Sequence, residues 1–442
     1  MNQPRVMVYV QHLLGTGHLK RAVLLSDAMT QAGLAVTLVS GGLPVPGLLP
    51  SGARWVQLPP VAAADLGFKA LVDARGQPVD EALRQLRRDT LLALWREIDP
   101  QLLLVELFPF GRRQMRFELL PLLDAARQAP RPPVIVSSVR DVLGGGTKDP
   151  LRQQRMLELF DRYFDHVLVH GDPSLLPFER TFAHVPALGT RLHYTGYVVD
   201  APTPGSGALI DAAHGHDAAH GHDAAHGHDA AHGHDAAHGH DAAHGRDAAH
   251  GHDAAHGHEV VHGHDEVLVS AGGGAVGLAL LETAIRARAL TQVADLRWRV
   301  LAGAGVGAGA FADLVALATA LHGDGVVVER NRSDFPQLLR RCRLSVSQAG
   351  YNTVMETLQA AARSVMVPFA GGSESEQTLR ASVLAERGWI GLIQEAALTP
   401  AALAMAIDVA AARAPQAPGS LRLDGANVSA RLVRGWMSHG QA

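Results

Sequence analysis

The sequence contains a single cysteine, Cys342, among its 442 residues. One cysteine excludes an intrachain disulfide framework and a zinc site built from several thiolates, as expected for a protein of a reducing cytoplasm. No stretch reaches the roughly 18 uncharged apolar residues that a membrane-spanning helix needs. The first residues, MNQPRVMVYVQHLLG, lack the cationic start and the cleavage site of a signal peptide. These absences predict a cytoplasmic protein with at most a peripheral contact with the inner membrane.

An excess of charge of either sign is also missing. Outside residues 212–265, 38 lysines and arginines stand against 34 aspartates and glutamates. This balance argues against a nucleic-acid-binding protein, which normally carries a strongly basic surface. Hydrophobic residues make up 47% of the chain, enough to bury large cores.

Residues 212–265 are nine consecutive hexads of the type Ala-Ala-His-Gly-His-Asp. Their small apolar side-chain mass predicts a flexible insert. Histidines spaced two apart beside a carboxylate suit nickel, zinc or cobalt, and the first ligand pairs are His214 with His216 and His220 with His222. Repeat expansion in a tolerant interdomain loop explains the pattern equally well.

The segments before the repeats alternate between apolar runs and helical patterns. Residues 5–12 form an apolar run that ends in a glycine turn, and a helical pattern at 19–29 leads into a second run at 34–39. Continuous apolar strands separated by helices indicate a parallel sheet covered on both faces. Further apolar runs lie at 102–105, 134–136 and 166–169, with helical patterns at 81–98 and 116–127.

The same pattern restarts after the repeats. Strands are predicted at 266–270, 298–302, 326–328, 344–346 and 364–367, and a helix at 278–290. The fold class is therefore α/β, with two doubly wound, Rossmann-like domains at 1–200 and 266–442 joined by a flexible linker at 201–265. Ligands of open parallel sheets bind at the carboxyl ends of the strands, so we expect the two domains to face a cleft.

Each predicted domain has a glycine-rich loop after its first strand. The first loop contains Gly15, Thr16 and Gly17, and the second contains Gly272, Gly273 and Gly274. Neither matches the dinucleotide fingerprint, which makes a nicotinamide enzyme less plausible. The second loop precedes a helix, where exposed backbone amides bind phosphate. A tight turn that needs glycine for steric reasons is the alternative.

A second possible anion site begins at Gly350, where a strand passes through a glycine turn into a helix carrying Asn352 and Thr353 in its first turn. Glu356 lies about one turn further and could accept two hydrogen bonds from a vicinal diol. The Thr353-x-x-Glu356 spacing is equally that of a capping box, which needs no ligand. Downstream, Glu376 and Gln377 add a polar cluster at the same predicted sheet edge.

These segments resemble the donor-binding half of the MurG-like glycosyltransferases, the family 28 group with the GT-B fold. Gly15-Thr16-Gly17-His18 is similar to the glycine loop of that family, which also ends in Gly-His. The resemblance spans both predicted domains but not the repeats. The matching C-terminal motifs are Gly350-x-x-Thr353-Val354-x-Glu356, Val367-Pro368-Phe369 and Glu376-Gln377-x-x-x-Ala381.

The resemblance implies a hexosyltransferase that uses a nucleotide sugar, with UDP as the expected nucleotide, and a hydroxyl acceptor. It implies that residues 272–274 and the helix near Gly350 cradle the diphosphate, and that Glu356 holds the ribose. Glu376 and Gln377 would contact the sugar, and Arg330 would lie near the nucleobase. It also implies that helix dipoles rather than a metal stabilise the diphosphate, so no cofactor is required.

The chain departs from the family on the acceptor side. Leu19, Lys20 and Arg21 follow His18, where the family usually has a proline a few residues after its histidine. The lipid-linked peptidoglycan acceptor of MurG is therefore not carried over as such. The run at 106–113 (ELFPFGRR) suggests a more anionic or phosphorylated acceptor, and a strand end with a solvated basic pair is the alternative. The expected partner is thus a hydroxyl acceptor that is lipid-linked or anionic.

Three residues are candidates for the chemical step. A loop histidine such as His18 could deprotonate the acceptor hydroxyl, because its pKa lies near neutrality; it could equally cap a helix or orient a phosphate. Asp141 is an alternative base or an orienting residue, and Glu106 closes a neighbouring strand. His12 and Cys342 are expected to be structural.

Two other functions fit parts of the sequence. A nucleotide-sugar 2-epimerase would share the architecture but would need acid and base groups around the sugar instead of an acceptor pocket. A metal-buffering protein with decayed catalytic domains would account for the repeats, but the intact glycine loops and Glu356 argue against it.

Overall fold

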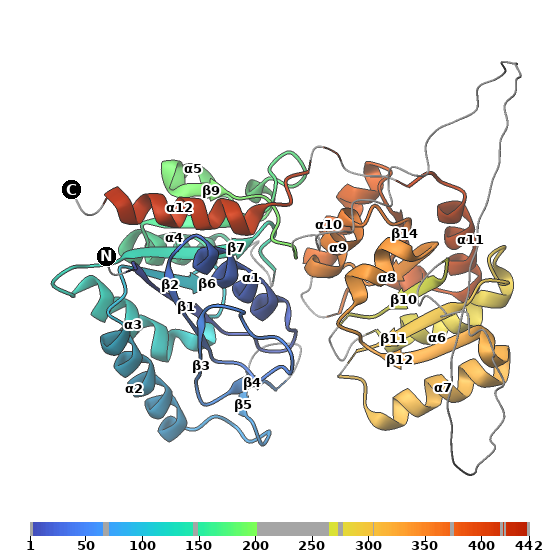
Figure 1. The fold of residues 1–442 in the computed structure, drawn as a ribbon, viewed down its shortest axis with the longest axis horizontal. Coiled ribbons are helices and arrows are strands. Elements are labelled where there is room, and N and C mark those ends of the chain that lie inside the picture. Colours follow the sequence, from blue (N-terminus) through green and yellow to red (C-terminus); the bar gives the residue numbers. More distant parts are fainter. Residues whose placement is uncertain are drawn as a thin grey trace, which may run out of the picture. The chain divides into compact units, whose positions relative to one another are not determined.

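The computed structural model describes residues 3–64, 70–144, 149–200, 265–272, 277–303, 305–371, 375–415, 419 and 421–439. Within these ranges the chain forms a seven-stranded and a six-stranded parallel sheet, and a small antiparallel pair of strands (Figure 1). The predicted α/β class with doubly wound parallel sheets is thus confirmed. All of the hexad repeats except Asp265 lie outside the described residues.

The N-terminal sheet is built around its first strand, which pairs in parallel with the second and the sixth strands of the chain. Its strand order is β3-β2-β1-β6-β7-β8-β9. The strands are β1 (Arg5–Val10), β2 (Ala35–Ser40), β3 (Arg54–Gln57), β6 (Leu102–Glu106), β7 (Val134–Arg140), β8 (His166–His170) and β9 (Leu192–Tyr194). The helices are α1 (Gly17–Gln31), α2 (Glu81–Ile98), α3 (Arg116–Arg127), α4 (Pro150–Tyr163) and the short α5 (Val185–Leu188).

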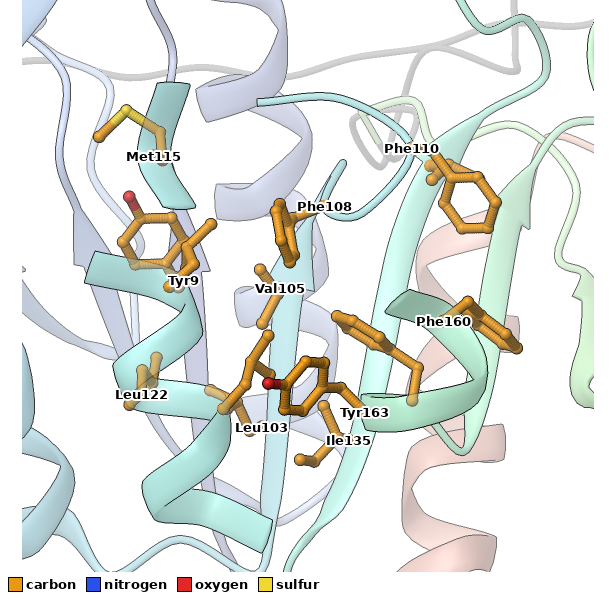
Figure 2. Packing of buried hydrophobic residues seen from close by; sticks show 14 of the residues in the cluster. Tyr9, Leu103, Val105, Phe108, Phe110, Met115, Leu122, Ile135, Phe160 and Tyr163 are labelled. Atoms are coloured by element: carbon orange, nitrogen blue, oxygen red, sulfur yellow. The ribbon is translucent and has the colours of Figure 1, made fainter. Parts of the chain in front are cut away.

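Alternate residues of β1 enter two different cores, because neighbouring side chains of a strand point to opposite faces. Met7 and Tyr9 pack with α2, α3 and α4, in the core drawn in Figure 2. Val6 and Val8 pack with α1 on the other face. Both faces of the sheet are therefore covered by helices.

The C-terminal sheet has the strand order β12-β11-β10-β13-β14-β15, with β10 in parallel register against β11 and β13. Its strands are β10 (Val267–Ser270), β11 (Trp298–Ala302), β12 (Val326–Arg330), β13 (Leu344–Ser347), β14 (Ser364–Met366) and β15 (Gly391–Leu392). Its helices are α6 (Leu278–Ala287), α7 (Ala308–His322), α8 (Phe335–Arg341), α9 (Tyr351–Gln359), α10 (Glu376–Glu386) and α11 (Pro400–Ala411).

The last helix, α12 (Gly425–His439), packs on α1 and not on the C-terminal sheet. Ala430, Val433 and Met437 lie in the same buried cluster as Val6 and Leu19. The predicted boundary that places all of 266–442 in the second domain is therefore wrong at its end. The apolar side of α12 is buried against the N-terminal sheet. The local sequence of α12 does not show which of the two sheets it packs on.

Several short strands were not predicted. They include β3, β9 and β15, together with β4 (Val61–Ala63) and β5 (Leu71–Asp73) of the antiparallel pair. Segments of two to four residues are too short for a hydrophobic period to show. Among the described residues, no helix has both the length and the apolar character needed to cross a membrane.

Candidate active site

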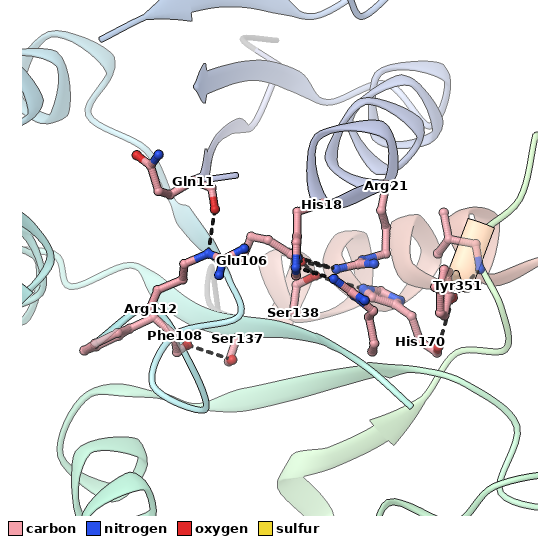
Figure 3. Close-up of polar contacts among 12 residues, drawn as sticks. Gln11, His18, Arg21, Glu106, Phe108, Arg112, Ser137, Ser138, His170 and Tyr351 are labelled. Atoms are coloured by element: carbon pink, nitrogen blue, oxygen red, sulfur yellow. Dashed lines mark hydrogen bonds and ion pairs between the residues drawn. The ribbon is translucent and has the colours of Figure 1, made fainter. Parts of the chain in front are cut away.

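The site is built at the carboxyl edge of the N-terminal sheet, where β6 ends at Glu106 and the loop after β1 leads into α1. Because β1 and β6 are neighbours in this sheet, the residues that follow them meet. His18 Nδ1 lies 2.8 Å from Glu106 Oε1, and the two residues are only 7% and 1% exposed (Figure 3). The structure thus brings two of the predicted catalytic residues into contact.

The partners of His18 fix its protonation. Arg140, the last residue of β7, contacts Nε2, and a guanidinium can only donate. Arg21 Nη2 also lies 3.2 Å from Nδ1, but the carboxylate of Glu106 is closer to that nitrogen, at 2.8 Å, and can only accept. Nε2 is therefore the acceptor, and Nδ1 carries the proton that is donated to Glu106. Burial, and then the nearby guanidinium of Arg140, hold the pKa of His18 well below its usual 6.5. The imidazole is neutral at pH 7, as a general base must be.

Glu106 is held by a buried polar network. Arg21 donates to its Oε1, and Ser138 Oγ donates to its Oε2 at 2.6 Å. Ser138 Oγ is in turn 2.9 Å from His170 Nε2 (Figure 3). The carboxylate is fixed from three sides and can hold the imidazole of His18 in one orientation.

Asp141, the alternative base, is fully buried in a different arrangement. Its Oδ1 accepts from Arg380 Nη2 at 2.7 Å, and its Oδ2 accepts from Arg380 Nε at 3.1 Å. Tyr197 also donates to Oδ2, at 3.2 Å. A carboxylate bound bidentately by a buried guanidinium is well placed to position α10, which carries Arg380. This geometry favours the orienting role over that of a base.

The helix α9 begins directly after Gly350, which is its N-cap. Because glycine has no side chain, no capping hydrogen bond is made at this position. Asn352 and Thr353 therefore lie in the first turn, where unpaired backbone amides can bind an anion. Thr353 is inside the helix and does not occupy the N-cap, so the capping-box interpretation of Thr353 and Glu356 is wrong. That the backbone amides at the start of α9 bind an anion remains a prediction.

Glu356 is 7% exposed and forms an ion pair with Lys20 of α1. Lys20 Nζ also lies 2.9 Å from Asp200 Oδ2. Burial raises the pKa of Glu356, and the ammonium of Lys20 offsets only part of that effect. A ribose diol bound at Glu356 would therefore compete with Lys20.

At the start of α10, Glu376 contacts two guanidiniums. Arg140 donates to Oε1, as does Arg380 Nη2 at 2.9 Å. Burial opposes ionisation of Glu376, but Arg140 and Arg380 outweigh it and lower its pKa to about 2. Gln377 Oε1 accepts the Phe369 amide at 3.1 Å, which ties α10 to the preceding loop.

The side chain of Arg330 is held by contacts with nearby residues of its own domain. It donates to the carbonyls of Gly303 and Val306, at 3.2 and 2.6 Å, and its guanidinium lies 4.2 Å from the Phe311 ring centroid. These contacts brace the loop after β11. Arg330 could shape a nucleobase site from this position, but its side chain is already committed to that loop.

The two glycine loops are described to different extents. Gly272 has φ +71°, a left-handed conformation that favours glycine, and Gly273 and Gly274 lie outside the described residues. In the first loop, the carbonyl of Thr16 accepts the Lys20 amide and starts α1. A Cβ atom added to Gly17 would lie 3.3 Å from Asn352 Nδ2, so glycine at this position permits the close approach of the Asn352 side chain. A Cβ atom added to Gly15 would have no other atom within 4 Å.

Sequence reasoning assigned no role to the buried cations of this site. Arg21, Arg140 and Arg380 are close to the predicted residues in sequence, but arginine is usually exposed, and only the fold shows that these three are paired. In the described part of the chain, no cluster of three or more His, Cys, Asp or Glu side chains could hold a metal. The predicted metal ligands His214, His216, His220 and His222 lie outside it.

Residues 307–420 match the model of the glycosyltransferase family 28 C-terminal domain. No match is found among curated proteins. MurG from Acinetobacter baumannii is similar over 98% of this chain and 100% of its own, with 13% identity and a TM-score of 0.54. A UDP-glucosyltransferase from Polygonum tinctorium is similar over 100% of both chains, with 12% identity and a TM-score of 0.55. The glycotransferase of kitacinnamycin is similar over 100% of this chain and 96% of its own, with 16% identity and a TM-score of 0.53.

At these identities the solved structures establish the fold, which is that of the GT-B glycosyltransferases. The matched domain contains Gly350, Glu356 and Glu376, the residues on which the resemblance in sequence rests. Neither the epimerase nor the metal-buffering alternative gains support from these similarities. A family 28 C-terminal domain within a chain of GT-B fold identifies the protein as a glycosyltransferase by domain and architecture.

Proposed function

We propose that this glycosyltransferase moves a hexosyl unit from a UDP-sugar to a hydroxyl acceptor, with His18 as the general base. The buried contact between His18 Nδ1 and Glu106 Oε1 is the observation that carries this proposal. The acceptor oxygen attacks the anomeric carbon while its proton passes to Nε2, and the bond from that carbon to the diphosphate breaks. Glu106 keeps Nδ1 protonated and stabilises the imidazolium that forms.

The donor would bind on the C-terminal domain. Amides in the first turn of α9, next to Asn352 and Thr353, face the diphosphate in this proposal and stabilise it as it leaves. No metal cofactor is needed for that step. Glu356 accepts the ribose hydroxyls, and Glu376 lies near the sugar.

The acceptor is expected to be anionic or lipid-linked. Leu14 and Leu43 are exposed in the loops directly after β1 and β2, at the same sheet edge as His18. An apolar acceptor, or a peripheral contact with a membrane, would cover them.

Donor choice can be tested with a panel of nucleotide sugars. We expect release of free UDP from one or more UDP-hexoses, and little release from sugars carried by other nucleotides. The measurement is a coupled assay for each free nucleotide, with and without candidate acceptors. Absence of turnover with every donor would contradict the proposed function.

Replacing Glu356 by alanine should weaken UDP binding roughly 10- to 150-fold, because a charge-assisted hydrogen bond is worth about 1.5 to 3 kcal/mol. Titration calorimetry with UDP measures the effect. Glu386→Ala is the matched control, because Glu386 is exposed at the end of α10. Equal affinities in the two folded variants would remove Glu356 from the donor site.

The histidine repeats are proposed to bind metal independently of sugar transfer. Deleting residues 212–265 should remove most nickel or zinc binding at neutral pH while folding and transfer are kept, because loop length has only a logarithmic effect on closure entropy. Binding to the intact chain should fall below pH of about 6.5, where protonated imidazoles no longer bind metal. Loss of transfer in a folded deletion variant would show that the repeats take part in the reaction.

A further inference from the structure

Three guanidiniums surround the proposed base. Arg140 comes from the end of β7, Arg21 from α1, and Arg112 from the loop after β6. In that loop Arg112 adopts φ +56°, a left-handed conformation that is costly for arginine and that holds the residue at the sheet edge. Glu106 faces these cations from the same edge, and Glu376 of α10 accepts a hydrogen bond from Arg140, so two carboxylates stand against the three guanidiniums. The cationic charge around His18 therefore exceeds the anionic charge that this edge supplies.

Some of the donors in this cluster have no acceptor. Arg21 is 1% exposed, and its Nε and Nη1 have no hydrogen-bond partner among the described residues. Arg112 uses Nε to bind the carbonyl of Gln11 (Figure 3). Burial and repulsion by Arg140 lower the pKa of Arg112 to about 10. Buried donors without an acceptor are costly, so the free donors of Arg21 show that the chain itself leaves part of the positive charge of this cluster uncompensated.

In this arrangement His18 cannot act as a base. Its Nε2, which must receive the acceptor proton, is already occupied by Arg140. A proton gained there would also place a fourth cation among Arg21, Arg112 and Arg140. The titratable and charged groups that face His18 are these arginines, Glu106 from β6 and His12 from the loop after β1. Arg140 itself also faces Glu376 and Arg380 of α10. An anion is needed to draw Arg140 away and to balance the charge.

We propose that a phosphate group of a substrate binds Arg140 and Arg112, withdraws Arg140 from His18 Nε2 and so makes the base competent. Arg140 is then a positioning residue that permits proton transfer only when the phosphate is bound. This inference rests on the proposed function of His18. The phosphate belongs to the acceptor or is the diphosphate of the donor, and the two sources can be separated by experiment.

The test follows the His18 imidazole by NMR in the full-length protein, with the signal assigned from its loss in His18→Asn. In Arg140→Gln the pKa of His18 should rise by about one unit or more, because the nearest cation is removed. Arg155→Gln is the matched control, because Arg155 is exposed on α4 and its loss should leave the pKa unchanged. An unchanged pKa in a folded Arg140→Gln variant would overturn the proposal.

Inorganic phosphate and UDP are then added separately to the unmodified protein. A rise in the His18 pKa with inorganic phosphate alone indicates a phosphate-bearing acceptor, and a rise with UDP alone indicates the donor diphosphate. Either response should be lost in Arg140→Gln, and no response to either probe would overturn the proposal. The NMR readout does not require turnover, so a response without transfer to any acceptor would contradict only the proposed function.

Discussion

Replacing His18 by asparagine is expected to lower sugar transfer about 100-fold or more, because the acceptor hydroxyl loses its general base. UDP affinity should change little, since His18 itself is not among the proposed donor contacts. The two quantities are measured as the maximal rate of UDP release and as the dissociation constant from calorimetry. A fall in rate at constant affinity separates a base from a residue that only binds substrate.

A matched control is His193→Asn on β9, where the imidazole contacts His166 and not the Glu106 network. This variant should keep near-normal turnover. Near-normal turnover in His18→Asn as well would show that the base lies elsewhere, and Asp141 would be the next residue to replace.

The second large effect is expected on stability, at the buried pair of Arg87 and Glu118. Both side chains are 0% exposed, with Arg87 Nη2 and Nε at 2.7 and 2.8 Å from the carboxylate of Glu118. Tyr9 donates to the same carboxylate. Glu118→Ala should lower the free energy of unfolding by about 3 to 5 kcal/mol, because it leaves a buried guanidinium without its counter-charge. Urea unfolding monitored by circular dichroism measures this loss.

The comparison is with an ion pair of the same residue types at the surface. Arg54 and Glu97 have side chains that are 53% and 54% exposed. Glu97→Ala should cost less than about 1 kcal/mol, since water screens the pair in both states. If the two variants unfolded at the same urea concentration, the prediction that burial makes the loss of Glu118 more costly than the loss of Glu97 would be wrong.

The central strands and the helices α1, α2, α3 and α6 could be predicted because each carries its own hydrophobic period, whereas α4, α7, α11 and α12 were not predicted. The helices predicted at 81–98 and 116–127 agree with the bounds of α2 and α3. Among the strands at the sheet edges, β12 was predicted, but β9 and β15 were missed, since they have only three and two residues. For these strands the neighbouring strand, not the local sequence, determines the extended conformation.

The candidate site was predictable only in part, for a related reason. His18 and Glu106 each follow a predicted apolar strand, so the rule that ligands bind at carboxyl edges placed both at the same edge of the sheet. Their direct contact follows from the pairing of β1 with β6, which was not predicted. The ion pair of Arg380 with Asp141 joins residues 239 positions apart. Such a pair follows from the strand order and the packing of α10, which no local pattern contains.

The packing of α12 on α1 also bears on how the chain folds as it is synthesised. Val433 and Met437 complete a core that contains Val6 and Leu19, more than 400 residues earlier in the sequence. One face of the N-terminal sheet, which α1 covers only in part, therefore stays incompletely covered until residues 425–439 have left the ribosome. The C-terminal sheet, whose strands all lie between residues 267 and 392, has every strand available before then. The domain that is translated first is thus the one whose core is closed last.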